Sequence, residues 1–271
     1  MTMIAEPTAD RAVVEMDEDL FGKTAADYSV EILRTFEPPE GYYLAFSGGK
    51  DSIVLKAMAD LAGVRYDAHY HTTCCDPPEV VRFIREHHPD VQRSMPPKTM
   101  WQLIVDKGML PTRTARWCCS ELKERGGEGR IVLTGVRSEE SPRRANRKIV
   151  EVCYKNPTKR FVHAIKHWTS ADIWGYIRGA HLPYPSLYDE PGVTRVGCVL
   201  CPFSRAVEFD IARWPKIAAA WKRAAFRGWE ANRLKGRSIP RLFANPEAYW
   251  TWWLDRDAPS PGPEECSLFG N

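Results

Sequence analysis

The stretch YYLAFSGGKDSIVLKAMADLAG, residues 42–63, predicts a buried strand that turns directly into a helix. An apolar run ends at Phe46, and an amphipathic run with helical spacing begins after Ser52. Between the two runs stands the hexapeptide Ser-Gly-Gly-Lys-Asp-Ser, residues 47–52, although one capping residue is enough to start a helix. Local structure alone therefore does not explain this junction.

The hexapeptide has the chemistry of an anion site. A loop that leaves the carboxyl end of a parallel strand and opens a helix is where such sheets bind ligands. Gly48 and Gly49 allow a sharp turn and a close approach of backbone N–H groups, and the helix dipole favours an anion there. Lys50 adds a positive charge. Asp51 would repel a phosphate, so we expect it to cap the helix or to hold Mg²⁺ against phosphates.

The spacing within the hexapeptide also excludes one class of nucleotide-binding protein. A Walker A motif has four residues between its first glycine and Gly-Lys, and this spacing is absent from residues 42–63. The loop is therefore not that of a P-loop NTPase, and the hydroxyls of Ser47 and Ser52 are further donors for a bound anion.

The composition is that of an ordinary globular protein. The chain has 271 residues, of which 44% are apolar and 27% charged, enough for one large α/β domain with an appendage. No uninterrupted apolar run approaches the length of a membrane span, and the acidic N-terminus lacks the features of a secretory signal. We expect a cytoplasmic protein without a membrane contact, in which the eight cysteines are reduced thiols or metal ligands.

Strand and helix patterns alternate over most of the chain. We expect strands at 42–46, 64–70, 130–136 and 160–165, and helices at 25–36, 52–61, 78–88, 99–107 and 170–179. Such alternation favours an α/β fold whose mainly parallel sheet carries helices on both faces. The expected organisation is a flexible N-terminus (1–24), an α/β nucleotide-binding domain (25–190), a helical region (191–257) and a flexible tail (258–271).

Two cysteine pairs predict a metal centre. Cys118 and Cys119 are adjacent, and Cys198 and Cys201 form a C-x-x-C pair. Neighbouring Cα atoms lie about 3.8 Å apart, shorter than a normal disulfide spans, so the adjacent pair is a poor disulfide. Two thiol pairs far apart in sequence suit a four-coordinate centre, and both zinc and a [4Fe–4S] cluster fit the ligand count. We expect the remaining central thiols to be inert: Cys74, Cys75 and Cys153.

Several motifs together resemble a known family. The hexapeptide 47–52 is similar to the PP-loop of the N-type ATP pyrophosphatases, which split ATP between its α and β phosphates. With TTCCDPPEVVRFI (72–84), RWCCSELKE (116–124), GVRSEESPRRA (135–145), HWTSADIWGYI (167–177) and LPYPSLYDE (182–190), it resembles the PAPS reductase-like family over residues 40 to 205. The resemblance implies a Rossmann-like sheet of the adenine nucleotide alpha hydrolase-like type.

The resemblance also implies roles for individual residues. Lys50, Asp51 and Arg137 would be catalytic, and the cluster-binding branch of the family favours [4Fe–4S] over zinc at the two cysteine pairs. ATP and Mg²⁺ would be held by the loop and by a second strand-end loop with its neighbours. The implied binding residues are Ser47, Gly48, Gly49, Lys50, Asp51, Ser52, Asp76, Gly135, Arg137, Glu140, Arg143 and Arg144.

Two functions within the family compete. Sulfonucleotide reductases receive a ready-made adenylyl sulfate and typically have a degenerate loop, whereas this chain keeps the complete Gly-Gly-Lys-Asp-Ser. The intact loop favours an enzyme that adenylates an acceptor for sulfur transfer, such as DNA phosphorothioation, with DNA favoured over tRNA. A cysteine desulfurase or another sulfur donor would then be a partner. The alternatives are an adenylyl-sulfate reductase and a zinc-stabilised nucleic-acid-binding module with a vestigial loop.

The C-terminal third contains a basic segment. Between Arg213 and Arg241 there are nine lysines or arginines and one acid, Glu230. Four aromatic residues are interleaved with these cations: Trp214, Trp221, Phe226 and Trp229. The pattern fits either a solvated basic face whose aromatics form a core or a surface for a polyanion.

The tail carries one more cysteine in the sequence ECSLF, residues 265–269. Glu265-Cys266 is similar to the C-terminal nucleophile of the reductases, and the segment also resembles the short tails that dock on bacterial sliding clamps. A redox nucleophile, a docking peptide and an inert tail all stay open.

Overall fold

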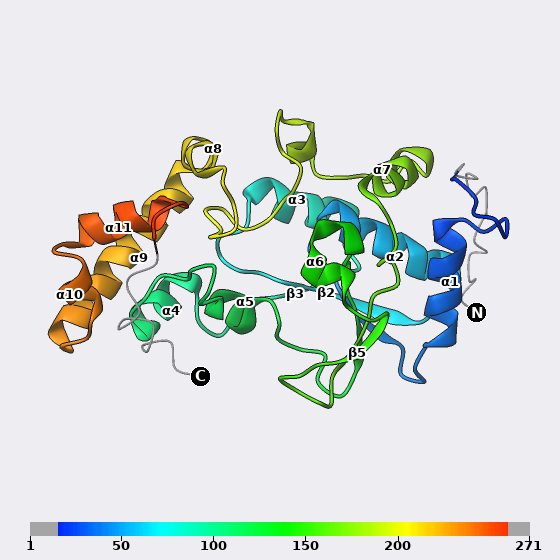
Figure 1. The fold of residues 1–271 in the computed structure, drawn as a ribbon, viewed down its shortest axis with the longest axis horizontal. Coiled ribbons are helices and arrows are strands. Elements are labelled where there is room, and N and C mark those ends of the chain that lie inside the picture. The colour runs from blue at the N-terminus through cyan, green and yellow to red at the C-terminus, as the bar shows by residue number, and fades with distance from the viewer. Residues whose placement is uncertain (1–15, 260–271) are drawn as a thin grey trace, which may run out of the picture. The chain divides into compact units, whose positions relative to one another are not determined.

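The computed structural model describes residues 16–259, which form two compact units whose segments alternate along the chain (Figure 1). The first unit comprises the chain up to Tyr70, residues 82–92 and residues 127–195. The second comprises residues 71–81, 93–126 and the chain from Val196 onward. The last crossing lies close to the domain boundary expected near residue 190. No local pattern indicates that 71–81 and 93–126 group with the helical end, because that grouping rests on contacts between segments distant in sequence.

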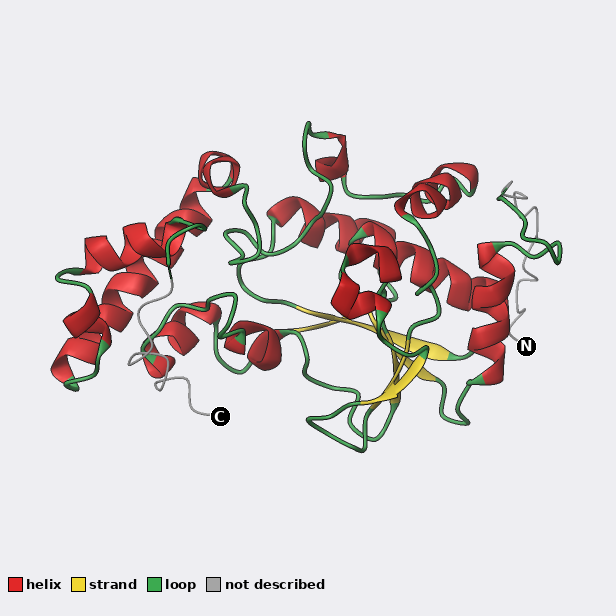
Figure 2. Cartoon of the chain, in the orientation of Figure 1, coloured by secondary structure: helices red, strands yellow, loops and turns green. Residues whose placement is uncertain are grey.

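The helices and strands are drawn in red and yellow in Figure 2. The first half contains α1 (Ala25–Thr35), β1 (Tyr42–Ala45), α2 (Lys50–Ala62), β2 (Tyr66–His71), α3 (Pro78–His87), β3 (Gln92–Ser94), α4 (Met100–Lys107), α5 (Trp117–Leu122) and β4 (Ile131–Leu133). The second half contains η1 (Ser138–Glu140), α6 (Pro142–Ala145), β5 (Val150–Val152), β6 (Arg160–Val162), α7 (Ser170–Gly179), η2 (Ser186–Asp189), α8 (Val207–Arg213), α9 (Pro215–Leu234), α10 (Ile239–Leu242) and α11 (Pro246–Leu254). Within residues 16–259, no helix combines the length and the apolarity needed to cross a membrane.

The sheet has six strands in the order β3-β2-β1-β4-β6-β5. β1 runs parallel to β2 and β4, and β4 runs parallel to β6, while the edge strand β5 is antiparallel to β6. This confirms the expected Rossmann-like, mainly parallel α/β fold. The strand expected over 130–136 is shorter, because the chain leaves the sheet after Leu133 to form a loop. β3 and β5 were not expected, since each has three residues and neither is buried.

Burial explains why the opening stretch forms this junction. Tyr42, Tyr43 and Leu44 of β1 are buried, as a central parallel strand requires. The first turns of α2 are buried as well, with Ile53, Val54 and Leu55 at most 2% exposed. α2 packs against α1 and α7, so both ends of the hexapeptide are anchored in the first unit (Figure 1).

The second unit is built around α9, which contacts α4, α8, α10 and α11. Trp221 is 1% exposed and packs against Trp101 and Trp253. Trp214 and Trp229 are buried too. The interleaved tryptophans therefore form the core of this unit, and its outward face carries the cations. Cys266 and most of the two ends that we expect to be flexible lie outside the described residues.

Two glycines of the first unit allow a matched test of the turn before β1. Gly41 (φ +77°) and Gly63 (φ +70°) both lie in the left-handed region, but a Cβ on Gly41 would come within 2.9 Å of the Arg65 carbonyl oxygen. A Cβ on Gly63 meets nothing within 4 Å. We expect Gly63→Ala to lower the free energy of unfolding by about 1–2 kcal/mol, the cost of the left-handed region.

Gly41→Ala should cost clearly more than this, because rigid backbone atoms must also move apart. Urea unfolding of both variants, followed by circular dichroism, measures the difference. Equal losses would contradict the close approach of Gly41 and Arg65.

Candidate functional site

The hexapeptide follows β1 and runs into α2, whose first turn contains Lys50, Asp51 and Ser52, so the helix begins two residues before the start expected at Ser52. Gly48 is in the left-handed region (φ +72°), which explains why a glycine is needed at that position. Gly49 is the N-cap of α2 and supplies no side-chain hydrogen bond to the helix. The N-terminus of this buried helix is therefore capped by groups other than the N-cap residue itself.

Hydroxyl oxygens accept the hydrogen bonds of the loop N–H groups. The Ser47 N–H donates to Ser52 Oγ at 3.2 Å, the Gly49 N–H to Ser47 Oγ at 3.4 Å and the Lys50 N–H to Tyr188 Oη at 3.1 Å. Ser52 Oγ in turn donates to the Gly49 carbonyl at 2.8 Å. The loop is thus a row of donors whose acceptors are neutral oxygens, and a phosphate could replace them.

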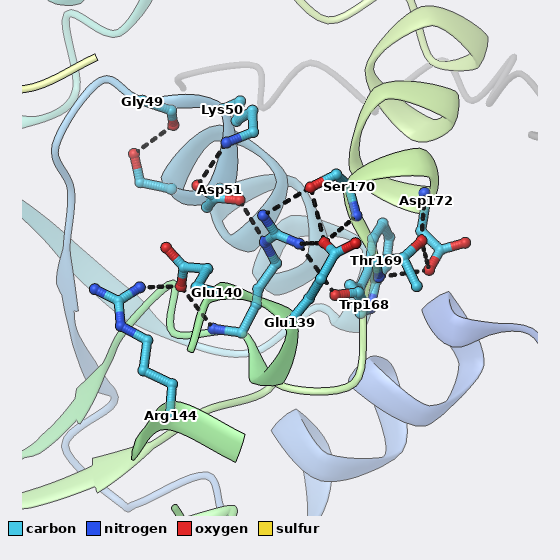
Figure 3. A network of polar contacts seen from close by, with 12 residues as sticks. Gly49, Lys50, Asp51, Glu139, Glu140, Arg144, Trp168, Thr169, Ser170 and Asp172 are labelled. Atoms are coloured by element: carbon cyan, nitrogen blue, oxygen red, sulfur yellow. Dashed lines mark hydrogen bonds and ion pairs between the residues drawn. The ribbon is translucent and has the colours of Figure 1, made fainter. Parts of the chain in front are cut away.

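Asp51 lies between two cations in the first turn of α2 (Figure 3). Its Oδ1 accepts a hydrogen bond from Arg137 Nε at 2.7 Å, and its Oδ2 is 3.3 Å from Lys50 Nζ. A single carboxylate at a helix start suits Mg²⁺, which keeps several waters and binds through one or two carboxylates and substrate phosphates. Asp51 therefore fits that mode, in which the substrate completes the site.

Arg137 is only 2% exposed, and its guanidinium donates four hydrogen bonds within the first unit. Besides Asp51, it donates to Glu139 Oε2 at 2.7 Å, to the Trp168 carbonyl at 3.2 Å and to Ser170 Oγ at 3.2 Å. Burial disfavours its charge, but the Asp51 and Glu139 carboxylates outweigh this effect and raise the pKa of Arg137. Ser170 and Arg137 together lower the pKa of Glu139. In this structure Arg137 fixes the position of Asp51.

The loop after β4 reaches the loop after β1 at a glycine. A Cβ on Gly135 would lie 3.3 Å from the carbonyl carbon and the Cβ of Asp51, so a larger residue would press on the start of α2. Glu140 accepts a hydrogen bond from the Arg137 N–H at 3.1 Å and pairs with Arg144. Arg143 is exposed. The structure therefore brings Gly135, Arg137, Glu140 and Arg144 together. The three arginines differ in their surroundings, because Arg137 is buried, Arg144 pairs with Glu140 and Arg143 is exposed.

Asp76 belongs to the second unit, and its implied place at the nucleotide stays a prediction. Its Oδ2 accepts a hydrogen bond from the Thr73 N–H at 2.6 Å, which closes the turn after β2. Its charge acts on Lys123 and on Cys198, both of the same unit. Within the second unit, Asp76 is thus a neighbour of the thiols.

All four thiols of the two pairs belong to the second unit. A hydrogen bond with Cys118 and the nearby Arg116 lower the pKa of Cys119. A hydrogen bond with Cys75 and the charge of Lys123 lower the pKa of Cys198. The charge of Cys198 also contributes to a raised pKa of Cys118 and of Cys201. The donor chemistry fits a thiolate-bound metal. Among residues 16–259, however, no three Cys, His, Asp or Glu side chains surround one point as ligands.

The C-x-x-C turn is supported by hydrogen bonds with residues outside the cysteine motifs. Asp210 accepts the Leu200 N–H at 2.7 Å, and Trp221 Nε1 donates to the Val199 carbonyl at 3.1 Å. Arg256 donates to the carbonyls of Leu200 at 3.2 Å and Ser204 at 3.1 Å. Leu200 itself has a positive φ of 57°, a conformation that needs such support.

Three further neighbours of Cys198 were missed. Cys75, expected to be inert, is buried and forms a hydrogen bond with Cys198, and Thr73 Oγ1 lies 3.3 Å from Cys75 Sγ and 3.5 Å from Cys198 Sγ. The Cys198 charge, the Asp76 charge and a hydrogen bond to Cys198 raise the pKa of Lys123. The only sequence signal was that Lys123 and Cys75 stand inside the two motifs with adjacent cysteines.

Comparisons with known proteins agree with the motifs. An uncharacterized protein of Methanocaldococcus jannaschii is 29% identical over 205 residues, covering 66% of this chain and 40% of its own length. The adenosine 5'-phosphosulfate reductase of Staphylococcus haemolyticus is 26% identical over 67% of this chain and 78% of its own. The chain spans less than half the length of its first relatives.

A solved structure and a family model complete the comparison. The phosphoadenylyl-sulfate reductase of Candida auris aligns with 63% of this chain and 87% of its own, with a TM-score of 0.48 and 19% identity. The model of the phosphoadenosine phosphosulfate reductase domain matches residues 41–204, more than half of the chain. This chain therefore belongs to the phosphoadenosine phosphosulfate reductase domain family.

Proposed function

We propose that the chain binds ATP at residues 47–52 and transfers AMP to an acceptor oxygen, with release of pyrophosphate. One observation carries the proposal: the complete hexapeptide starts a buried helix that has no side-chain N-cap, and it presents Lys50 beside an Asp51 that Arg137 fixes at 2.7 Å. A loop that had lost nucleotide chemistry would have no need of two charged residues held in this way.

In this mechanism the acceptor oxygen forms a bond to the α-phosphorus of ATP, and the bond from that phosphorus to the pyrophosphate oxygen breaks. The loop N–H groups and the Lys50 ammonium stabilise the negative charge that develops on the departing pyrophosphate. Asp51 would hold Mg²⁺, which when bound neutralises phosphate charge. Arg137 keeps the Asp51 carboxylate oriented through its hydrogen bond to Oδ1.

We propose sulfur transfer as the purpose of this activation. AMP is a good leaving group, so a sulfur nucleophile from a donor such as a cysteine desulfurase could displace it from the acceptor. Cys118, Cys119, Cys198 and Cys201 would hold a [4Fe–4S] cluster, with zinc as the alternative. When bound, such a cluster would supply the chemistry for handling sulfur at these thiols. The proposed acceptor is a nucleic acid, DNA before tRNA, as in phosphorothioation.

The family match supports a second candidate, an adenylyl-sulfate reductase, since relatives named adenosine 5'-phosphosulfate reductase cover up to 67% of this chain. The two candidates consume different substrates. Pyrophosphate release from ATP identifies the first, and sulfite release from adenylyl sulfate with a thiol reductant identifies the second. If the protein is inactive in both assays and is colourless with bound zinc, the remaining function is that of a zinc-stabilised nucleic-acid-binding module.

Lys50→Ala and Asp51→Asn test the loop. Each should lower the rate of pyrophosphate release at least about a hundredfold, the usual effect of removing one preorganised electrostatic group. Asp60→Asn is the matched control, because it removes a half-exposed carboxylate from the same helix, α2, away from its first turn. Release of pyrophosphate from ATP is measured with DNA, tRNA and sulfide present in turn. Full activity in both loop variants would remove the hexapeptide from the mechanism.

Serine variants of the four cysteines test the proposed cluster. Cys118→Ser and Cys198→Ser should each reduce bound iron and bleach the visible absorbance of anaerobically purified protein, because a thiolate ligand is lost. Cys153→Ser, which changes a thiol outside both pairs, should keep both signals. Iron content and zinc content are measured together. Unchanged iron in serine variants of all four cysteines would contradict this ligand set.

The outward face of α9 supports a polyanionic acceptor. Lys216, Arg223 and Arg227 are exposed and lie seven and four residues apart, hence on one side of the helix. None of the three forms an ion pair with another residue of the range 16–259. By contrast, Lys222 pairs with Glu247 at 2.7 Å, and Arg233 pairs with Glu230. The unpaired cations therefore keep their charge available for phosphates.

This difference gives a charge-matched test of nucleic-acid binding. Arg223→Gln with Arg227→Gln should weaken DNA binding and lower the slope of log affinity against log salt by about 2, since each lost phosphate contact accounts for about 0.9. Lys222→Gln with Arg233→Gln removes the same net charge from paired positions and should change the slope little. Affinity is measured by fluorescence anisotropy at several salt concentrations. Equal losses in both pairs would indicate a net-charge effect rather than a binding face.

A further inference from the structure

A tyrosine hydroxyl lies at the N-terminus of α2. Tyr188 Oη accepts the Lys50 N–H at 3.1 Å, and an added Cβ on Gly49 would lie 3.4 Å from the same oxygen. The hydrogen bond and this short distance place the oxygen over the first turn of the helix, where the dipole and the N–H groups favour an anion. Lys50 also points its ammonium toward the Tyr188 ring, 5.8 Å from the centroid.

Tyr188 comes from a distant segment that is itself well anchored within the first unit. It belongs to the short helix η2, whose Leu187 is buried. Trp174 of α7 packs edge-on against both Tyr184 and Tyr188, with ring centroids 5.3 and 5.1 Å apart. The Tyr184 hydroxyl instead donates to Asp189 at 3.1 Å, and within residues 16–259 it forms no hydrogen bond with the loop 47–52. Of these two neighbouring tyrosines, Tyr188 is the one engaged with Lys50.

We infer that the Tyr188 hydroxyl occupies an anion position of the 47–52 loop and that a phosphate group displaces it, so that Tyr188 sets the affinity of the loop for phosphate. The inference rests on the proposed function, because it requires that this loop binds a polyphosphate. A phosphate oxygen carries more negative charge than a phenolic oxygen, so it is the stronger acceptor for the Lys50 N–H.

Displacement also changes the surroundings of Lys50. In this structure its ammonium contacts the Asp51 carboxylate and lies over the Tyr188 ring. A bound phosphate would replace the contact with the ring by an interaction with a full negative charge. The net affinity is therefore the phosphate interaction minus the hydrogen bond that Tyr188 gives up. Removing only the hydroxyl should make phosphate binding tighter, which is the opposite of what damage to a binding site does.

The test compares two single-hydroxyl deletions in the full chain. Calorimetric titration with inorganic pyrophosphate should give about threefold to tenfold tighter binding for Tyr188→Phe than for the unchanged protein, the worth of one neutral hydrogen bond. Tyr184→Phe, which removes the neighbouring hydroxyl that bonds Asp189, should bind as the unchanged protein does. Thermal unfolding without ligand shows whether each variant is folded.

Three outcomes overturn the inference in distinguishable ways. Equal affinity of Tyr188→Phe and the unchanged protein would show that the hydroxyl does not compete with phosphate, and weaker binding would show that it contacts the bound anion. Both results leave the loop as a phosphate site, and the proposed function stands. If no folded form binds pyrophosphate and Lys50→Ala makes no difference, the proposed function and the inference fail together.

Discussion

The ion pair between Arg137 and Asp51 joins the two loops on which the candidate site depends. One partner follows β4 and the other starts α2, and their side chains meet at 2.7 Å with Arg137 almost completely buried. Burying a guanidinium is costly, and an ion pair in the interior seldom repays its desolvation in stability. The additional bonds from Arg137 to Glu139, Trp168 and Ser170 satisfy the cation. Such an arrangement is best explained by the fixed position that it gives to Asp51.

The other features of the first unit follow from this constraint. Gly135 has to be small because its loop approaches the Asp51 backbone closely. Ser170 both accepts from Arg137 and donates to Glu139, which ties the start of α7 to the same carboxylates. Trp168 supplies its carbonyl to Arg137 and its Nε1–H to Ser29 of α1 at 2.9 Å. The network in Figure 3, extended by the bond from Trp168 to Ser29, therefore connects the site to α7 and α1. Its residues come mainly from the GVRSEES and HWTSAD motifs.

The sequence predicted what has a local signature. Four parallel strands, β1, β2, β4 and β6, were recognisable from their apolar runs, and the hexapeptide was recognisable from its glycines and charges. Long-range partners were not recognisable: Tyr188 is 138 residues from Lys50, and nothing near either residue announces their hydrogen bond. Arg137 stood out only as one of a run of arginines, and nothing near it in the sequence indicated that four of its N–H groups bond Asp51, Glu139, Trp168 and Ser170. Its implied place at the nucleotide stays a prediction. Patterns identify residue types suited to a chemistry, whereas partners distant in sequence decide how each side chain is held.

The same reasoning explains why the second unit carries so much aromatic core for its size. A turn that contains Leu200 with positive φ needs partners for its backbone groups, and Asp210, Trp221 and Arg256 provide them from α8, α9 and the chain after α11. Trp221 can donate to the Val199 carbonyl only because Trp101 and Trp253 hold its ring. The inner side of these helices therefore donates and accepts the hydrogen bonds that support the Cys198–Cys201 turn. The outer side of α9 makes none of these contacts, and it carries the unpaired cations Lys216, Arg223 and Arg227.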